Sequence, residues 1–446
     1  MKSKQYAALL ILLLILPLFL SCSLKVAVVS AQTPPSLYFG VDVAYGNITA
    51  TEQLIDNVSS YSNFFVIGCT GNYNQTTLTI ISQYAYDKGL TFIVYSDRPN
   101  YPSSQWLEDA KNNWGNSFLG IYYLDEEGGK QLDQAEYPIV PESSVTEAAN
   151  YSYSDAAESY VNTLNRLLRS GSFAVTNNFA YPTEFQLFTS DYAFYWYDYE
   201  AGYNTVFDEF GYRTGWANDS QQLNMALCRG AATVQNKDWG VMITWAYDQP
   251  PYMEPGPELY NDMVLAYENG AKYIVIFDSN TNYTQNVLVQ GQLDAMKQFW
   301  QYAQANPRTI TPVSERTAYV LPADYAYGFG GPDDKIWGLW NADSLTVDIG
   351  MSVVTLLQMD GKNLDMVYPD GPQTIESAGY GSVIYWNNTI LIPTPTPSPS
   401  PSQGTSLPFY AADIYLYAIT AGILIAVAVI VIKFKRTGLS RYYTTW

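Results

Sequence analysis

The chain has 446 residues, of which 42 are acidic and 22 basic, and it contains no histidine. The lack of histidine excludes Ser-His-Asp and Cys-His catalysis, as well as zinc or non-haem iron held by histidine. The formal charge of -20 argues against a nucleic-acid partner, because phosphate binding needs a basic face. Acid–base chemistry therefore falls to carboxylates, with Tyr, Lys or Cys as lesser candidates.

Residues 1–31 have the pattern of a secretory signal peptide. Lys2 and Lys4 form a charged start, residues 7–20 are apolar, and Val29-Ser30-Ala31 offers small residues at a cleavage point. An uncleaved N-terminal anchor is the alternative.

A repeated pattern then runs from residue 36 to residue 280, in which a short apolar segment alternates with a longer helical one. Strands are expected at Leu37–Val43, Phe64–Cys69, Leu90–Tyr95, Phe118–Leu124, Phe173–Thr176, Thr205–Phe207, Gly240–Trp245 and Lys272–Phe277. Helices are expected at Thr51–Tyr61, Gln75–Lys88, Ser103–Asn112, Val145–Arg169, Ser190–Tyr199, Ser220–Gln235, Pro257–Asn269 and Gln290–Ala305.

Eight such units predict an α/β fold, a (β/α)8 TIM barrel over residues 32–308. An open doubly wound sheet is the alternative, although no G-x-G-x-x-G follows the first strand. Residues 309–392 are expected to form a small α/β domain, with a β-sandwich as its alternative. Cys69 and Cys228 are expected to be buried free thiols rather than a disulfide.

The end of the chain predicts a membrane anchor. Residues 393–409 form a Pro/Ser/Thr-rich stalk, and 410–432 contains an uncharged apolar run long enough to span a bilayer. Basic residues begin the tail 433–446, which places that tail in the cytoplasm and the rest of the chain outside. Segment 32–409 keeps 15 basic and 41 acidic residues, so the expected ectodomain is more acidic than the whole chain suggests.

Acidic residues follow most of the expected strands. In a TIM barrel these strand ends converge on one mouth, where catalytic residues lie. A solvated loop acid or a helix N-cap is the plain explanation for any single one of them. Their recurrence at one rim indicates a site made of Asp42, Asp97, Asp125, Glu126, Glu127, Glu209, Asp248 and Asp278.

The fourth expected strand carries the sharpest signal. Gly120-Ile121-Tyr122-Tyr123-Leu124-Asp125-Glu126 resembles the fourth-strand "G-x-Y-x-x-D-E" pattern of glycoside hydrolase-type TIM barrels. The resemblance implies that Glu126 is the general acid/base, with Glu127 or Asp125 tuning it. Retaining members of that superfamily place a nucleophilic Glu after the seventh strand, where this chain has Asp248. We therefore expect Asp248 or Glu209 to act as the nucleophile, or as the base that activates water.

Aromatic residues accompany the acids. Tyr122, Trp196, Trp245 and Tyr247 lie at or near the expected strand ends and loops, where flat rings can stack on sugar rings. Since 40 tyrosines occur in the chain, chance placement is the alternative.

Two functions follow from these patterns. The first is an extracellular, membrane-anchored glycoside hydrolase that acts on a carbohydrate through carboxylates. The second is a non-catalytic surface protein that binds glycans or an envelope protein on a barrel scaffold. The overall layout also resembles that of archaeal cell-surface proteins. We expect no cofactor and no catalytic metal, and keep calcium only as a structural ion.

Overall fold

The computed structural model describes residues 36–68, 74–96, 101–135, 137–147, 150–170, 185–210, 220–244, 253–278, 287–369 and 375–388. The expected signal peptide, stalk, transmembrane helix and cytoplasmic tail lie outside these residues, as does Cys69. No helix within the described ranges is long and apolar enough to cross a bilayer.

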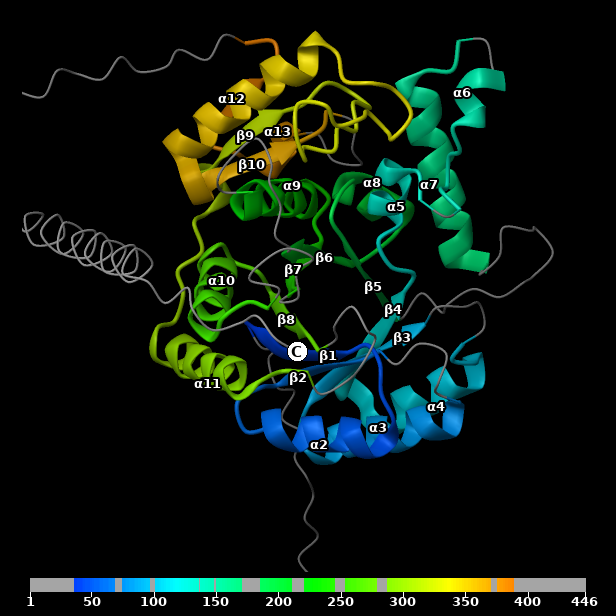
Figure 1. Cartoon of the computed structure of the whole chain (residues 1–446), viewed down its shortest axis with the longest axis vertical. Helices are drawn as coiled ribbons and strands as arrows, with labels where there is room; N and C mark the ends of the chain where they lie inside the picture. The colour runs from blue at the N-terminus through cyan, green and yellow to red at the C-terminus, as the bar shows by residue number, and fades with distance from the viewer. Residues whose placement is uncertain are drawn as a thin grey trace, which may run out of the picture. The chain divides into compact units, whose positions relative to one another are not determined.

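Eight parallel strands close into a barrel, which confirms the predicted (β/α)8 architecture (Figure 1). The last strand pairs with the first, so the sheet has no free edge. In chain order the strands are β1 (Tyr38–Val43), β2 (Phe64–Ile67), β3 (Thr91–Ser96), β4 (Phe118–Tyr123), β5 (Gln186–Asp191), β6 (Thr205–Phe210), β7 (Asp238–Ile243) and β8 (Tyr273–Phe277).

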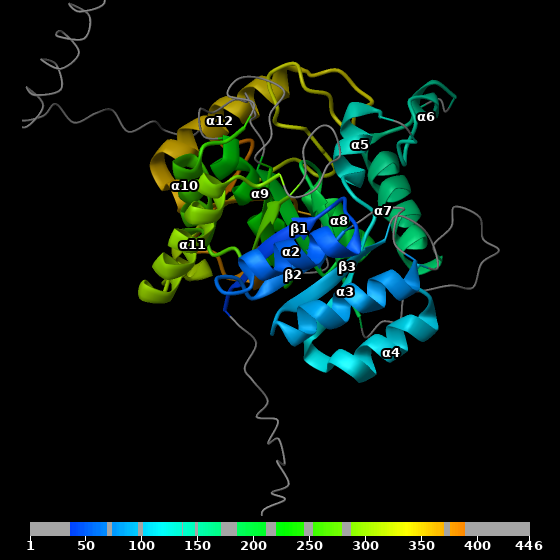
Figure 2. The ribbon, with the colours of Figure 1, turned by 60° about the horizontal axis from the view of Figure 1, so that its bottom comes forward.

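Helices surround this barrel. Figure 2 shows α2, α3 and α4 together along one side. Their apolar faces pack on the outward side chains of the strands and form the larger hydrophobic core. The helices are α2 (Ile48–Val58), α3 (Gln75–Asp87), α4 (Ser104–Trp114), α5 (Glu127–Asp133), α6 (Ser143–Glu147), α7 (Tyr153–Ser170), α8 (Tyr195–Ala201), α9 (Ser220–Val234), α10 (Gly256–Glu268) and α11 (Gln290–Ala305).

The barrel interior is filled by its own apolar cluster. Tyr38 and Tyr273 stack at the junction of β1 and β8, with their ring centroids 4.8 Å apart. Phe64, Phe188 and Phe207 pack beside these rings. The interior is therefore a packed core below the mouth of the barrel, as the alternation of strand side chains requires.

The fifth unit differs from the prediction. The strand expected at Phe173–Thr176 lies outside the described residues, and the fifth barrel strand is instead β5, at Gln186–Asp191. The helix expected at Ser190–Tyr199 was wrong at its start, because Ser190 ends a strand and α8 begins at Tyr195. The strand side chains alternate there, with Phe188 inside the barrel and Asp191 outside.

The long helix expected at Val145–Arg169 is also wrong, because two helices, α6 and α7, occupy this stretch. Asn150, between them, has a φ of 78°, a left-handed conformation that a continuous α-helix cannot contain.

A small C-terminal layer follows the barrel. It contains a parallel sheet in the order β10-β9-β11, made of β9 (Thr317–Val320), β10 (Leu364–Val367) and β11 (Ser382–Tyr385). Helix α12 (Ser344–Asp360) and the short α13 (Ile375–Ala378) accompany it. The predicted small α/β element is therefore present. It belongs to the same compact unit as the barrel, and α9 packs on β10.

A buried ion-pair network joins this layer to the barrel. Asp365 of β10 accepts from Arg229 Nε of α9 at 2.7 Å and from Arg316 at 2.9 Å. Tyr380 donates to the same carboxylate at 2.9 Å, and Arg229 also donates to the main chain of Leu364 and to Asn269. Each buried charge thus has an opposite charge and further hydrogen bonds.

The Asp365→Asn substitution should destabilise the protein by about 3–5 kcal/mol, because it leaves two buried guanidinium groups without their counter-charge. Chemical denaturation would measure the loss. The matched control is Glu142→Gln, which breaks the exposed Glu142–Lys335 pair and should change stability by less than about 1 kcal/mol. An equal, small effect of both variants would contradict this interpretation of the network.

Candidate active site

The chain leaves β4 through a strained turn. Leu124 has a φ of 61° and Glu126 a φ of 54°, so two residues other than glycine adopt left-handed conformations on either side of Asp125. The Glu126 N–H donates to the Ser190 carbonyl oxygen at 3.0 Å, which ties this turn to β5. Such strain persists only where neighbouring structure holds it, and it is frequent at functional sites.

Asp191, at the end of β5, stabilises this strained turn. Its buried carboxylate accepts hydrogen bonds from the N–H groups of Gly128 at 2.6 Å and Gly129 at 2.8 Å, in the first turn of α5. It also accepts from the N–H groups of Tyr192 and Ala193, in its own turn. One carboxylate therefore fixes the segments after β4 and β5 against each other.

The two glycines are required by this close approach. A Cβ atom on Gly128 would lie 2.7 Å from the Ala193 carbonyl oxygen, and one on Gly129 would lie 2.1 Å from the Tyr192 ring. The Asp-Glu-Glu-Gly-Gly sequence after β4 thus combines acids with the two small residues that let α5 pack on the β5 turn.

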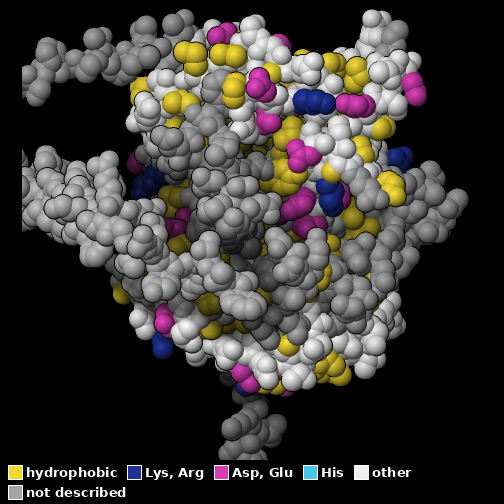
Figure 3. All heavy atoms as spheres, in the orientation of Figure 1, with side chains coloured by type: hydrophobic (Ala, Val, Ile, Leu, Met, Phe, Trp, Pro, Cys, Tyr) yellow, Lys and Arg dark blue, Asp and Glu magenta, His cyan; other side chains and the backbone are white. Residues whose placement is uncertain are grey.

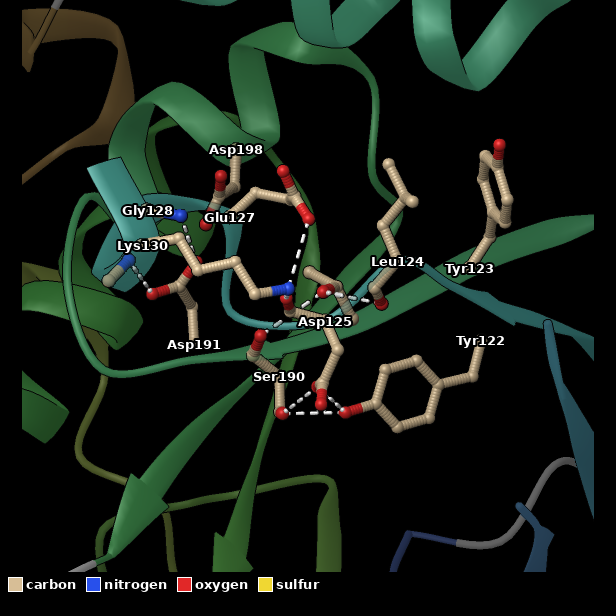
Figure 4. Close-up of polar contacts among 12 residues, drawn as sticks. Tyr122, Tyr123, Leu124, Asp125, Glu127, Gly128, Lys130, Ser190, Asp191 and Asp198 are labelled. Carbon is tan, nitrogen blue, oxygen red and sulfur yellow. Dashed lines mark hydrogen bonds and ion pairs between the residues drawn. The ribbon is translucent and has the colours of Figure 1, made fainter. Parts of the chain in front are cut away.

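Polar side chains meet just inside the barrel mouth, and Figure 4 shows Tyr122, Asp125 and Ser190 among them. The Tyr122 hydroxyl is hydrogen-bonded to Asp125 and lies 2.6 Å from Ser190 Oγ. Ser190 Oγ lies 2.8 Å from Asp125 Oδ1 and 2.5 Å from Glu209 Oε1. Ser190 on β5 therefore connects Asp125, which follows β4, to Glu209 on β6.

These groups line a cavity of about 200 Å³ at the carboxyl ends of the strands. Its carboxylates are Asp42, Asp125, Glu126 and Glu209, and its aromatic side chains are Tyr45, Tyr95, Tyr122 and Phe277. Acidic side chains also gather near the centre of the face that Figure 3 shows. The predicted meeting of strand-end carboxylates is thereby realised for four of the predicted residues.

Burial and mutual repulsion change the acidity of the cavity carboxyls. Burial raises the pKa of Glu209 well above its usual value, and the negative charges of Glu126 and Asp125 raise it further. A hydrogen bond between the Glu209 and Glu126 side chains acts in the same direction. The protonation of Glu209 therefore depends on the charge of Glu126.

A second buried carboxyl pair lies outside the barrel. Burial raises the pKa of Asp191 to about 7. Burial also raises the pKa of Asp198 well above its usual range, and the neighbouring charge of Asp191 adds to this. Tyr160 donates to Asp198 at 2.9 Å. Since four main-chain N–H groups favour the ionised form of Asp191, Asp198 is the member of the pair that carries the proton.

Three other predicted site residues do not line the cavity. Glu127 begins α5 and pairs with Lys130 at 3.2 Å. Trp196 of α8 is buried against Tyr368 of the C-terminal layer. Asp278 accepts hydrogen bonds from the N–H groups of residues 287 and 288, which lie before α11, so it holds a loop rather than capping a helix. The predicted Asp97, Trp245, Tyr247 and Asp248 lie outside the described residues.

Sequence reasoning missed Ser190, Asp191, Tyr45 and Tyr95. The signal for the first two was the alternation in Gln186-Leu187-Phe188-Thr189-Ser190-Asp191, which identifies a strand with a polar end. Tyr95 belongs to β3 and points inward two residues after Ile93. Within the described ranges, no group of three or more Asp, Glu or Cys side chains is arranged to hold a metal ion.

No protein-family model matches the sequence, and no curated protein matches it. Among solved structures, the chain is similar to an alpha-L-fucosidase from Paenibacillus thiaminolyticus, with 13% identity and a TM-score of 0.44 over 78% of this chain and 59% of that one. The catalytic module of a family 98 glycoside hydrolase from Streptococcus pneumoniae has 11% identity and a TM-score of 0.42, over 79% of this chain and 66% of that one. A 3-keto-L-gulonate-6-phosphate decarboxylase from Vibrio cholerae has 8% identity and a TM-score of 0.29, over 60% of this chain and 98% of that one. Likenesses this distant say nothing about the chemistry of the cavity.

The raised pKa values predict that stability falls as the pH rises from about 4 to about 7. In this window the folded protein keeps protons on Asp42, Asp198 and Glu209 that the unfolded chain, with carboxyl pKa values near 4, has released. Their stabilisation is complete below pH 4 and is lost as the pH passes the folded values. Thermal unfolding at several pH values would measure this. Asp198→Asn should flatten the slope, whereas a melting temperature that rises from pH 4 to pH 7 would contradict it.

The Gly129→Ala substitution should cost about 1–3 kcal/mol, because the added methyl group displaces the Tyr192 ring and its hydrogen bond to Asp133. The matched control is Gly291→Ala in the first turn of α11, where the new Cβ meets open space. That control should be neutral or stabilising by up to about 1 kcal/mol. Denaturant unfolding separates the two, and equal effects would argue against the tight α5–β5 packing.

Proposed function

We propose that the protein is a glycoside hydrolase-like enzyme that cleaves a carbohydrate in the barrel-mouth cavity. The observation that carries this proposal is that the carboxyls of Glu126, on the turn after β4, and Glu209, on β6, line one cavity together with aromatic rings. Glycosidic bond hydrolysis needs two carboxyl groups, one as proton donor and one as nucleophile or base.

The proton donor needs to stay protonated near neutral pH. Burial and neighbouring negative charge raise the pKa of Glu209, and its contact with Glu126 lets the pair hold one proton. Glu126 lies on the strained turn after β4, at the mouth, and is the member expected to deliver that proton to the leaving oxygen. Glu209, on β6, first passes its proton to Glu126 through their contact and then holds the negative charge.

In the proposed reaction the bond between the anomeric carbon and the glycosidic oxygen breaks. The oxygen keeps the bonding electrons and takes the proton from the carboxyl pair. The anomeric carbon receives either the Glu209 carboxylate, which water later displaces, or water directly, with Glu209 accepting the water proton. A sugar that binds between Glu126 and Glu209 has to part their hydrogen bond. A distance of roughly 5–5.5 Å between the two carboxyl groups would then indicate retention, and a distance of roughly 6.5–9.5 Å would indicate inversion.

Neighbouring side chains support these roles. Ser190 lies within hydrogen-bond distance of Glu209 and Asp125, which positions the sixth-strand carboxyl, and Tyr122 anchors Asp125 in turn. The rings of Tyr45, Tyr95 and Phe277 offer flat apolar faces on which a sugar ring can stack. Asp248 stays a predicted alternative nucleophile.

We also propose that this enzyme works outside the cell, tethered by a membrane helix at 410–432. The support is the sequence alone: a signal-like start at 1–31, a Pro/Ser/Thr-rich stalk and an apolar segment followed by basic residues. An archaeal source stays an expectation of the same kind.

Activity on a panel of neutral and charged glycans tests the proposed chemistry. Glu126→Gln and Glu209→Gln should each lower kcat by about 10²-fold to 10⁴-fold, because each removes the proton or the carboxylate from the pair. Their melting temperatures should stay equal or rise, since a buried negative charge is removed. The matched control is Glu108→Gln on the exposed face of α4, which should leave kcat unchanged.

Two outcomes would overturn the hydrolase proposal. Glycans that bind in the cavity without being cleaved would favour the non-catalytic glycan-binding protein. A broad panel that is neither cleaved nor raises the melting temperature would exclude carbohydrate as the ligand of this cavity.

A further inference from the structure

Asp42 is a buried carboxyl with an oxygen atom that none of the described residues pairs with. It lies on β1, lines the cavity and is 4% exposed. Its Oδ1 atom is buried, and none of the described residues donates a hydrogen bond to it. Buried polar atoms in folded proteins are almost always paired, so an unpartnered carboxyl oxygen in a cavity wall needs an explanation.

The neighbouring strand shows what a structural aspartate looks like here. Asp278 follows β8, beside Asp42, and its carboxylate receives the N–H groups of Val287 at 3.0 Å and Leu288 at 3.2 Å. Asp278 therefore holds the chain before α11. Asp42 has no such task among the described residues, and its side chain is directed toward Gly68 in the cavity wall.

The surroundings of Asp42 are negatively charged. Asp125, Glu126 and Glu209 share the cavity with it, while none of the described lysines or arginines lines the cavity. Lys130, on α5, donates instead to the Asp125 carbonyl oxygen and to Glu127. A cavity with four carboxyls repels anionic ligands and favours a cation.

The remaining wall also suits an organic cation. Tyr95 and Phe277 line the cavity, and aromatic faces attract ammonium groups. A metal ion fits less well, because no set of three or more acidic or cysteine ligands among the described residues has suitable geometry. The volume of about 200 Å³ is small for a ligand pocket and suits one sugar ring.

We propose that the cavity selects a sugar unit with an unsubstituted amino group, whose ammonium binds against Asp42. This inference rests on the proposed function and narrows its substrate class to glycans that contain free amino sugars. Uronic acid and sulfated sugars are excluded by the same charges, and neutral sugars bind without the ammonium–Asp42 pair.

Proton linkage gives this inference its own signature. Burial, together with the charges of Asp125 and Asp278, raises the pKa of Asp42. An ammonium group favours the ionised form, so its binding should release a proton from Asp42 in the pH range in which the free protein keeps Asp42 protonated. Affinity should therefore increase as the pH rises through that range. A neutral sugar should release no proton.

Isothermal titration calorimetry of the full chain with glucosamine, glucose and N-acetylglucosamine tests the inference. Glucosamine should bind at least tenfold more tightly than either neutral sugar. Its binding enthalpy should change between buffers of different ionisation enthalpy, which reports the released proton. Asp42→Asn should reduce the preference to less than threefold and abolish the proton release. Its melting temperature should not fall, since Asp42 has no described partner to lose.

The matched control is Asp348→Asn, the same chemical change on the exposed side of α12, which should keep the full preference. Equal affinity for glucosamine and glucose, no binding by any of the three sugars, or a preference that survives Asp42→Asn would each overturn the inference. A lysine analogue such as N-acetyl-lysine methylamide that binds as tightly as glucosamine would also overturn it, in favour of a peptide ligand.

Hydrolysis assays distinguish this inference from the proposed function. Cleavage of neutral glycans that depends on Glu126, without preference for amino sugars, would leave the hydrolase standing and overturn the inference. Amino-sugar selectivity that depends on Asp42, without cleavage of any glycan, would support the inference and count against the hydrolase.

Discussion

The hydrogen bonds from four main-chain N–H groups to the buried Asp191 carboxylate are the interaction on which the candidate site depends. They join the first turn of α5 to the turn after β5, and so decide where Glu126 stands relative to Ser190 and Glu209. The strained conformation of Glu126 is stabilised by these hydrogen bonds to Asp191 and by the hydrogen bond that its own N–H donates to the Ser190 carbonyl oxygen. The position of the carboxyls inside the barrel thus depends on a carboxylate outside it.

Strand alternation explains how neighbouring acids acquire different tasks. Ser190 and Asp191 are adjacent on β5, yet one faces the cavity and the other faces α5. On β6, Glu209 faces the cavity, while Asp208 accepts the Tyr195 hydroxyl from α8. A shift of one residue in either strand would exchange these roles, because side chains point to opposite faces in turn. Register is therefore as important to the site as residue type.

Much of this could be predicted from local sequence. The barrel followed from repeated apolar segments and helices, and Asp42, Asp125, Glu126 and Glu209 followed from their places at strand ends. The fifth strand was misplaced because Gln186–Asp191 holds few apolar residues, while an apolar run occurs earlier at 173–176. The hydrogen bonds of Asp191 to Gly128 and Gly129 could not be predicted. They join residues that are 63 and 62 positions apart in the sequence, and their donors are main-chain N–H groups, which almost every residue has.

The stacked Tyr38 and Tyr273 rings, with the phenylalanines beside them, fill the barrel interior, so the cavity is open only at the mouth of the barrel. Nothing can pass along the barrel axis, so a molecule that reaches the cavity has to turn back and leave on the side by which it came. Arrival of a new molecule and departure of the old one then compete for the same passage. The exchange of molecules at such a site is governed by what happens at the rim as much as by the carboxyls at its base.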